Sequence, residues 1–358
     1  ANLMKIKTRH VLLLVVVLLV LHFFYKPNTA VVEVNNYTHK AENAESYTHV
    51  YTTETVNYKR VDNVASKVKA QPKPAPVQQN SCELIHDPEE LEYAQSELSQ
   101  LNDNLDFTAE KFDIGPYTSV NLITPNVNSD YHKTLRIRLF EAYEKYQNLF
   151  GLYPDKPILM NLVVLPNNYY DDYVSRFGAL PSNNAGIYFG KNNTALVRFD
   201  EADPQSSLRV AIHEAMHVIN FNLIGSTPRW LNEGIAEVFE NTLIYKTNRT
   251  IAIPTYRVRR TYMEFRSLID SEALWEQQSY RGDLYANANN WLAFFIQHKQ
   301  GRRVLKAIVQ AEAKNPCNTL ENEVILNALS TYFIDYEQAY LVWLKASKQV
   351  KGEFIPVY

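Results

Sequence analysis

The chain has 358 residues, a formal net charge of -3 and 46% hydrophobic residues, an ordinary globular composition with enough length for one large domain or two modest ones. Its positive and negative residues are interspersed and form no basic stripe, which argues against a nucleic-acid partner.

The N-terminal region has the pattern of a membrane-targeting segment. An apolar run over 11–25 follows three positively charged residues, Lys5, Lys7 and Arg9. The run is short for a spanning helix, which needs about 20 residues, so it fits either a signal-peptide core or a short signal anchor. Residues 28–30 (NTA) match a cleavage site poorly, which favours an uncleaved transmembrane anchor. The cations predict that residues 1–10 are cytoplasmic and that the rest faces the periplasm or the extracellular space. Residues 1–3, before Met4, are open to interpretation as an added remnant.

The segment 26–80 is polar and ends in alternating prolines over 71–76 (QPKPAP). Alternating prolines are typical of a stiff, extended spacer. We therefore expect 26–80 to be a disordered, extracytoplasmic linker that tethers a folded domain to the membrane.

Only two cysteines occur, Cys82 and Cys317, near the two ends of the expected folded part. Two isolated cysteines exclude a thiolate zinc site built from paired CxxC ligands. In an oxidising compartment they would form one disulfide that closes most of the globular region, and we favour this over two unpaired thiols.

The first half of the globular part mixes helices and strands. Its spacing predicts helices over 88–105, 133–150 and 169–177, and strands over 117–124 and 157–165. Segments 186–190 and 194–199 flank a polar turn and predict a β-hairpin. Helix-start residues over 203–207 then precede an apolar-periodic helix over 208–223.

Beyond Gly225 nearly every segment has helical spacing. The expected helices are 230–241, 257–269, 285–298, 303–313 and 336–346. Strands with helices followed by helices alone predict an α+β fold. It would have a small mixed sheet lobe over 81–224, which includes the edge hairpin and the helix over 208–223. A mainly helical lobe over 225–358 would follow.

The helix over 208–223 contains the motif HExxH. Its histidines, His213 and His217, are four residues apart and lie one turn apart on the same helix face, so both can reach one metal ion. Glu214 is adjacent and offset, where it can accept a proton from a metal-bound water. The alternative is a helix with two surface histidines and an incidental acid, and the downstream sequence argues against it.

A second helix follows with the sequence WLNEGIAE over 230–237, which places Glu233 sixteen residues after His217. HExxH followed by this segment resembles the gluzincin superfamily of zinc metallopeptidases, which includes thermolysin and the membrane alanyl aminopeptidases. The resemblance implies that His213, His217 and Glu233 bind one Zn²⁺, and that Glu237 orients a ligating histidine. Two histidines and one carboxylate also leave a fourth position for water.

Two features limit the resemblance. The gap between His217 and Glu233 is shorter than in thermolysin or the aminopeptidases and is closer to small peptidase-MA-like families, and no GAMEN-like exopeptidase motif is present. The rival pattern HExxHxxGxxH fails, because Asn220 and Leu223 stand where it needs Gly and His.

The resemblance implies peptide-bond hydrolysis by Glu214-assisted attack of zinc-bound water. Tyr285, at the expected start of a helix, is the candidate donor to the oxyanion, with Tyr280 and Arg281 as alternates. The edge hairpin 186–199 would pair with an extended peptide or protein substrate. Two other functions stay open: hydrolysis of amides in cell-wall peptides, and a non-catalytic, membrane-tethered adaptor with this fold.

Overall fold

The computed structural model describes residues 86–104, 106–126, 129–180, 183–244, 249–260, 262–352 and 354–357. The predicted cytoplasmic segment, signal anchor and linker lie outside this part of the chain, as does Cys82; Cys317 is disulfide-bonded. None of the described helices is both long and apolar enough to cross a membrane.

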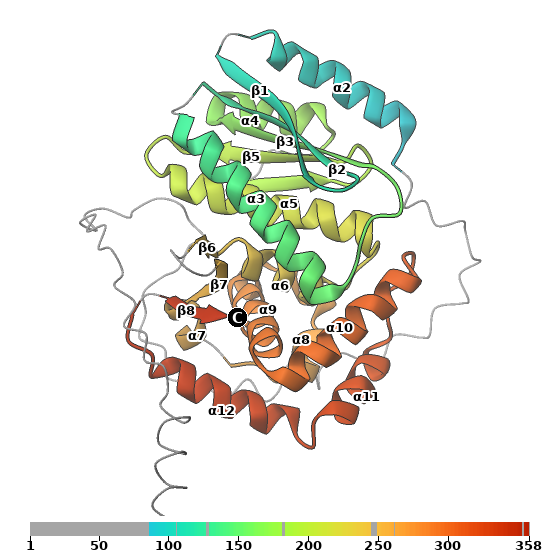
Figure 1. Cartoon of the computed structure of the whole chain (residues 1–358), viewed down its shortest axis with the longest axis vertical. Coiled ribbons are helices and arrows are strands. Elements are labelled where there is room, and N and C mark those ends of the chain that lie inside the picture. Colours follow the sequence, from blue (N-terminus) through green and yellow to red (C-terminus); the bar gives the residue numbers. More distant parts are fainter. Residues whose placement is uncertain are drawn as a thin grey trace, which may run out of the picture. The chain divides into compact units, whose positions relative to one another are not determined.

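A five-stranded mixed sheet lies at the centre of the first half of the fold (Figure 1). Its strands are β1 (Phe107–Gly115), β2 (Thr118–Pro125), β3 (Ile158–Pro166), β5 (Thr194–Phe199) and β4 (Gly186–Phe189), given in spatial order. The central strands β2, β3 and β5 are parallel, whereas β1 and β4 pair antiparallel with their neighbours. The predicted hairpin is therefore confirmed as β4–β5, with β4 at the edge. The patterns that predicted the other strands missed β1.

Helices cover both faces of the sheet. They are α2 (Pro88–Asn102), α3 (Ser129–Phe150), α4 (Asn167–Arg176) and α5 (Pro204–Leu223). Along β3, Met160, Leu162 and Val164 face α3 and α5, while Val163 and Leu165 face α2 and α4. All five of these side chains are fully buried. A strand buried on both faces needs a nearly continuous apolar run, which is why 157–165 lacks alternation; Asn161 is its one polar interruption.

The residues after 225 are mainly helical, as predicted. The helices are α6 (Arg229–Phe239), α7 (Thr255–Arg260), α8 (Phe265–Ile269), α9 (Gln278–Gln297), α10 (Lys299–Lys314), α11 (Asn322–Tyr332) and α12 (Tyr336–Lys348). Together with the mixed sheet, they confirm the predicted α+β fold. Below, residues 86–224 are called the sheet lobe and residues 225–357 the helical lobe.

Three details of the helical lobe differ from the prediction. The helix expected over 257–269 is broken into α7 and α8, because Glu337 of α12 holds the intervening loop by accepting from the Phe265 amide (2.7 Å) and the Tyr262 hydroxyl (3.1 Å). The helix expected at 285 begins at Gln278 instead. The segment 322–332, which was not predicted, forms α11.

A second, small antiparallel sheet was also not predicted. It consists of β6 (Thr242–Ile244), β7 (Arg249–Pro254) and β8 (Phe354–Val357). Ile253 of β7 pairs with Ile355 of β8, about a hundred residues later in the chain. Pairing over such a distance leaves no local pattern in the sequence.

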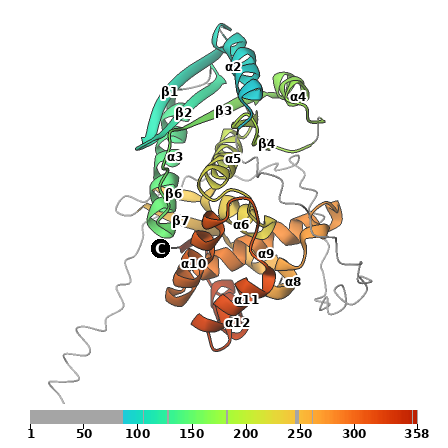
Figure 2. The same cartoon turned by 90° about the vertical axis from the view of Figure 1, so that its right-hand side faces the viewer.

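The two lobes meet at α5 and α6, and α5 lies between the sheet and α6 (Figure 2). Helix α9 packs against α6 and approaches its backbone unusually closely at Gly234. A Cβ added there would lie 2.9 Å from the backbone oxygen of Ala288. Glycine therefore permits the spacing of α6 and α9, which brings the residues beside Gly234 close to the N-terminal half of α9.

Candidate metal centre

Helix α5 places both motif histidines on one face, as predicted. Asp203 caps the helix by accepting from the Ser206 amide (3.0 Å), and Pro204 occupies its first turn, where a missing N–H costs nothing. The rings of His213 and His217 have centroids 4.7 Å apart at an interplanar angle of 84°. Their ligand atoms and a carboxylate oxygen of Glu214 all lie within 4.8 Å of one another.

Helix α6 brings Glu233 to the same point. Its Oε2 lies 3.4 Å from His213 Nε2 and 3.5 Å from His217 Nε2. This oxygen is buried and has no hydrogen-bond partner among the described residues. A buried carboxylate oxygen without a partner is costly unless a cation or a donor compensates it. Two imidazole nitrogens and one such oxygen are the donor set that Zn²⁺ prefers, so these residues fit the predicted zinc ion.

The histidines and carboxylates of the cluster shift one another's pKa values. Burial lowers the pKa of His213, but the carboxylates of Glu233 and Glu240 outweigh it and raise the pKa to about 10. Burial alone would raise the pKa of Glu233, yet His217 and His213 hold it below its usual value. The pKa of Glu214 rises to about 8, mainly because the carboxyl is buried. Burial lowers the pKa of His217.

An acid that the sequence did not suggest, Glu240, contacts the outer ring nitrogen of His213; the predicted Glu237 lies in the same cluster. Glu240 Oε2 lies 3.1 Å from His213 Nδ1, the nitrogen turned away from Glu233. Glu237 instead forms an ion pair with Arg257, which also reaches Glu240 at 3.5 Å. Positions 233, 237 and 240 share one helical face, so spacing alone does not tell Glu237 from Glu240. Sequence reasoning missed both Glu240 and Arg257.

Tyr285 lies on α9, two turns inside the helix rather than at its start. Burial, together with the charges of Glu233 and Glu214, raises the pKa of its hydroxyl well above the usual value. The hydroxyl thus stays protonated and can donate a hydrogen bond. Its ring packs edge-on against Trp275, with centroids 5.2 Å apart. Tyr285 lies one helical turn before Ala288, and Ala288 packs against Gly234, the neighbour of Glu233. This packing explains why the Tyr285 hydroxyl is coupled to Glu233.

The two alternates for this donor lie on the same helix. Arg281 uses its Nε–H to donate to the backbone oxygen of Trp275 (3.0 Å). Tyr280, like Tyr285, packs partly buried against the hydrophobic core. The Tyr285 hydroxyl is coupled to both Glu233 and Glu214, so we keep it as the candidate donor.

Glu214 also has a neighbour that the sequence did not suggest. Tyr170 of α4 is buried, and burial followed by the charge of Glu214 raises the pKa of its hydroxyl. The guanidinium of Arg198 lies over the Tyr170 ring, 4.4 Å from the centroid.

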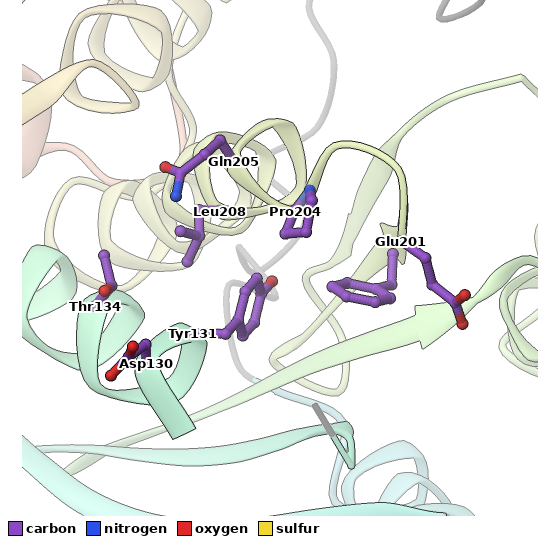
Figure 3. A pocket seen from close by; sticks show the side chains of 8 residues that line it. Asp130, Tyr131, Thr134, Glu201, Pro204, Gln205 and Leu208 are labelled. Atoms are coloured by element: carbon purple, nitrogen blue, oxygen red, sulfur yellow. The ribbon is translucent and has the colours of Figure 1, made fainter. Parts of the chain in front are cut away.

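A separate cavity of about 370 Å³ lies at the start of α5 (Figure 3). It is lined by Asp130, Tyr131, Thr134, Phe199, Glu201, Pro204, Gln205 and Leu208. None of the predicted catalytic or metal-binding residues contributes to it. The cavity is therefore distinct from the histidine–glutamate cluster.

The chain is similar, at low identity, to solved zinc metallopeptidases. An aminopeptidase N family protein from Idiomarina loihiensis aligns over 69% of this chain and 47% of its own, with 16% identity and a TM-score of 0.44. A mutant M1 zinc metallopeptidase from Deinococcus radiodurans aligns over 69% and 53%, with 12% identity and a TM-score of 0.35. A two-domain M1 zinc metallopeptidase mutant bound to L-arginine aligns over 69% and 52%, with 11% identity and a TM-score of 0.31.

The chain thus spans about half the length of these proteins. No family model and no curated protein matches its sequence.

Proposed function

We propose that the chain is a zinc-dependent metallopeptidase of the gluzincin type. The observation that carries the proposal is the convergence of His213, His217 and Glu233 from two helices. Glu233 Oε2 is buried between the two Nε2 atoms without a hydrogen-bond partner. A purely structural carboxylate in this position would be expected to find a donor.

His213, His217 and Glu233 would hold the metal. When bound, Zn²⁺ supplies Lewis acidity, which makes water more acidic and polarises a substrate carbonyl. Glu240 accepts from His213 Nδ1, which leaves Nε2 as the free ligand atom and fixes the ring orientation. Glu237 and Arg257 neutralise each other beside this pair, so Glu240 keeps its contact with the histidine.

Glu214 is the proposed general base and then general acid. Its carboxyl is buried within 4.8 Å of the ligand atoms of both histidines, where it can exchange a proton with a water on the metal. It accepts a proton from the attacking water, whose oxygen bonds to the carbonyl carbon of the peptide. It then delivers that proton to the leaving nitrogen as the C–N bond breaks. Tyr285 donates its O–H to the negative oxygen that develops on the carbonyl.

The substrate is proposed to be an extended peptide or protein segment along the hairpin 186–199. β4 is the last strand in the spatial order of the large sheet, and within the described residues no strand pairs with its outer side. Such an edge can add a peptide strand through backbone hydrogen bonds. β4 also packs against α5, the helix that carries Glu214. With the signal anchor expected over 11–25, the reaction is proposed to take place outside the cytoplasmic membrane.

The first test is the zinc content of the purified full chain, measured by mass spectrometry. We expect about one zinc per chain in the parent and almost none in His213→Ala. A folded parent that binds no zinc after reconstitution would overturn the metal centre.

The second test is cleavage of a peptide library by the zinc-loaded parent and by Glu214→Gln. We expect the parent to cleave and the variant to lose activity by about 10²–10⁴-fold while keeping its zinc. A zinc-loaded parent that cleaves only cross-linked cell-wall peptides would support the alternative function, hydrolysis of amides in the cell wall. One that cleaves neither would favour the adaptor.

A further inference from the structure

The edge strand β4 touches the proposed base directly at Gly186. Gly186 pairs with Val197 of β5 in the hairpin. A Cβ added at Gly186 would lie 2.5 Å from Glu214 Oε1, 2.6 Å from its Cγ and 2.8 Å from its Cδ. The three nearest atoms all belong to Glu214, so one face of this carboxyl side chain rests on the bare backbone of β4.

The backbone of β4 does not itself require glycine at this position. Gly151, Gly178, Gly225 and Gly352 adopt positive φ, whereas Gly186 does not, so any L residue could take its backbone conformation. Glycine inside a strand costs stability, because it loses more chain entropy on folding and packs no side chain. The missing side chain is therefore explained by the space that Glu214 occupies.

We propose that Gly186 is a positioning residue for Glu214. This inference rests on the proposed function, in which Glu214 transfers the proton. The backbone of β4 lies against the carboxyl group of Glu214, and the main chain of α5 fixes the other end of this side chain. Any side chain at 186 has to push the carboxyl group away, because the end of a glutamate is the part of this contact that can move. The metal ligands are not displaced, since none of the three nearest atoms belongs to them.

The kinetic test compares Gly186→Ala with Gly115→Ala, both in the zinc-loaded full chain. Gly115 ends β1, at the opposite edge of the sheet from β4, and a Cβ there would meet the Tyr143 ring and not Glu214. We expect Gly186→Ala to lose on the order of 10²-fold in kcat, the usual cost of an ångström-scale misplacement, with KM and zinc content close to the parent's. Gly115→Ala should keep the parent's kcat. A Gly186→Ala variant with unchanged kcat, or with a raised KM alone, would overturn the positioning role.

A double-mutant cycle tests the same contact without any activity. In the parent, Gly186→Ala should lower Tm or leave it unchanged, because the added methyl group collides with the Glu214 side chain. In a Glu214→Ala background the space is free, and the same change should raise Tm, since alanine is better than glycine in a strand. Equal Tm shifts in both backgrounds would refute the contact.

The two tests also separate this inference from the proposed function. If the parent cleaves no peptide but the cycle shows coupling, the contact stands and the peptidase proposal fails. If the parent cleaves and Gly186→Ala matches it in kcat, the positioning role fails alone.

Discussion

The sheet lobe and the helical lobe contribute to the proposed metal centre in different ways. The sheet lobe supplies three groups from five consecutive residues of one helix, His213 to His217. The helical lobe supplies Glu233 and Glu240 from α6 and Tyr285 from α9. The first set needs only an intact helix, whereas the second needs α6 and α9 packed at the spacing that Gly234 permits. The site should therefore respond differently to changes in the two lobes.

The largest effect is expected from the ligand that the helical lobe supplies. Glu233→Ala removes the carboxylate between the two Nε2 atoms, and two histidines alone hold zinc weakly. We expect zinc per chain, measured by mass spectrometry, to fall from about one to near zero, with the melting curve still cooperative. Glu276→Gln, an exposed acid that pairs with Arg229, is the control and should keep its zinc. Full zinc in Glu233→Ala would mean that the sheet lobe binds the metal by itself.

Removing the Tyr285 hydroxyl should have the next largest effect, a fall in kcat. Tyr285→Phe keeps the ring against Trp275 but loses the donor to the oxyanion. We expect kcat to fall by about 10²–10³-fold, with KM and zinc content unchanged. Steady-state kinetics of the zinc-loaded variant give this result directly. An unchanged kcat would leave Tyr285 as a packing residue.

Replacing the acid behind His213 should weaken zinc binding without abolishing it. Glu240→Gln removes the carboxylate 3.1 Å from Nδ1, and such changes cost about 10–100-fold in metal affinity. Competition with a zinc chelator measures the affinity. Glu237→Gln is the matched comparison and should have the smaller effect. If the order of the two variants is reversed, the predicted role of Glu237 is correct after all.

The spacing of α6 and α9 can be changed at Gly234. A Cβ there meets the backbone oxygen of Ala288, which cannot move aside as a side chain can. Gly234→Ala should cost about 1–3 kcal/mol of unfolding free energy, seen as a lower Tm. Because this change moves Glu233 and Tyr285 apart, kcat should fall as well. A variant with parental Tm and kcat would show that the helices have room to spare.

The smallest expected effect concerns a buried acid of the helical lobe that lies outside the site. Burial raises the pKa of Glu312 to about 7, although both its oxygens accept from the Leu320 amide at 3.1 Å. An acid whose pKa is higher in the folded than in the unfolded chain binds extra protons on folding. The contribution of Glu312 to stability should therefore be most favourable below about pH 4.5 and fall as the pH rises to about 7.

Glu312→Gln removes this dependence. Its Tm relative to the parent should increase between pH 5 and pH 8, as measured by thermal unfolding at both values. A pH-independent difference would mean that Glu312 stays ionised in the folded protein.

Much of the sheet lobe was predictable because its patterns are local. The apolar run at 157–165, the polar turn between β4 and β5 and the cap at Asp203 each specify an element within a dozen residues. β1 was not predicted, because nearly half of its residues are exposed and its apolar pattern is weak. Its strand conformation depends on pairing with β2. In the helical lobe, the break between α7 and α8 depends on Glu337, far away in the sequence.

The sequence by itself determined the α+β order of elements and the residues of the proposed metal centre that fit a motif: His213, Glu214, His217 and Glu233. Four-residue spacing on a helix places side chains on one face whatever surrounds it. The tertiary structure decided which acid meets His213, that Tyr285 is electrostatically coupled to Glu233, and that Gly186 touches Glu214. Each of these three pairs joins different elements, and the distance between elements depends on packing, which no local pattern records.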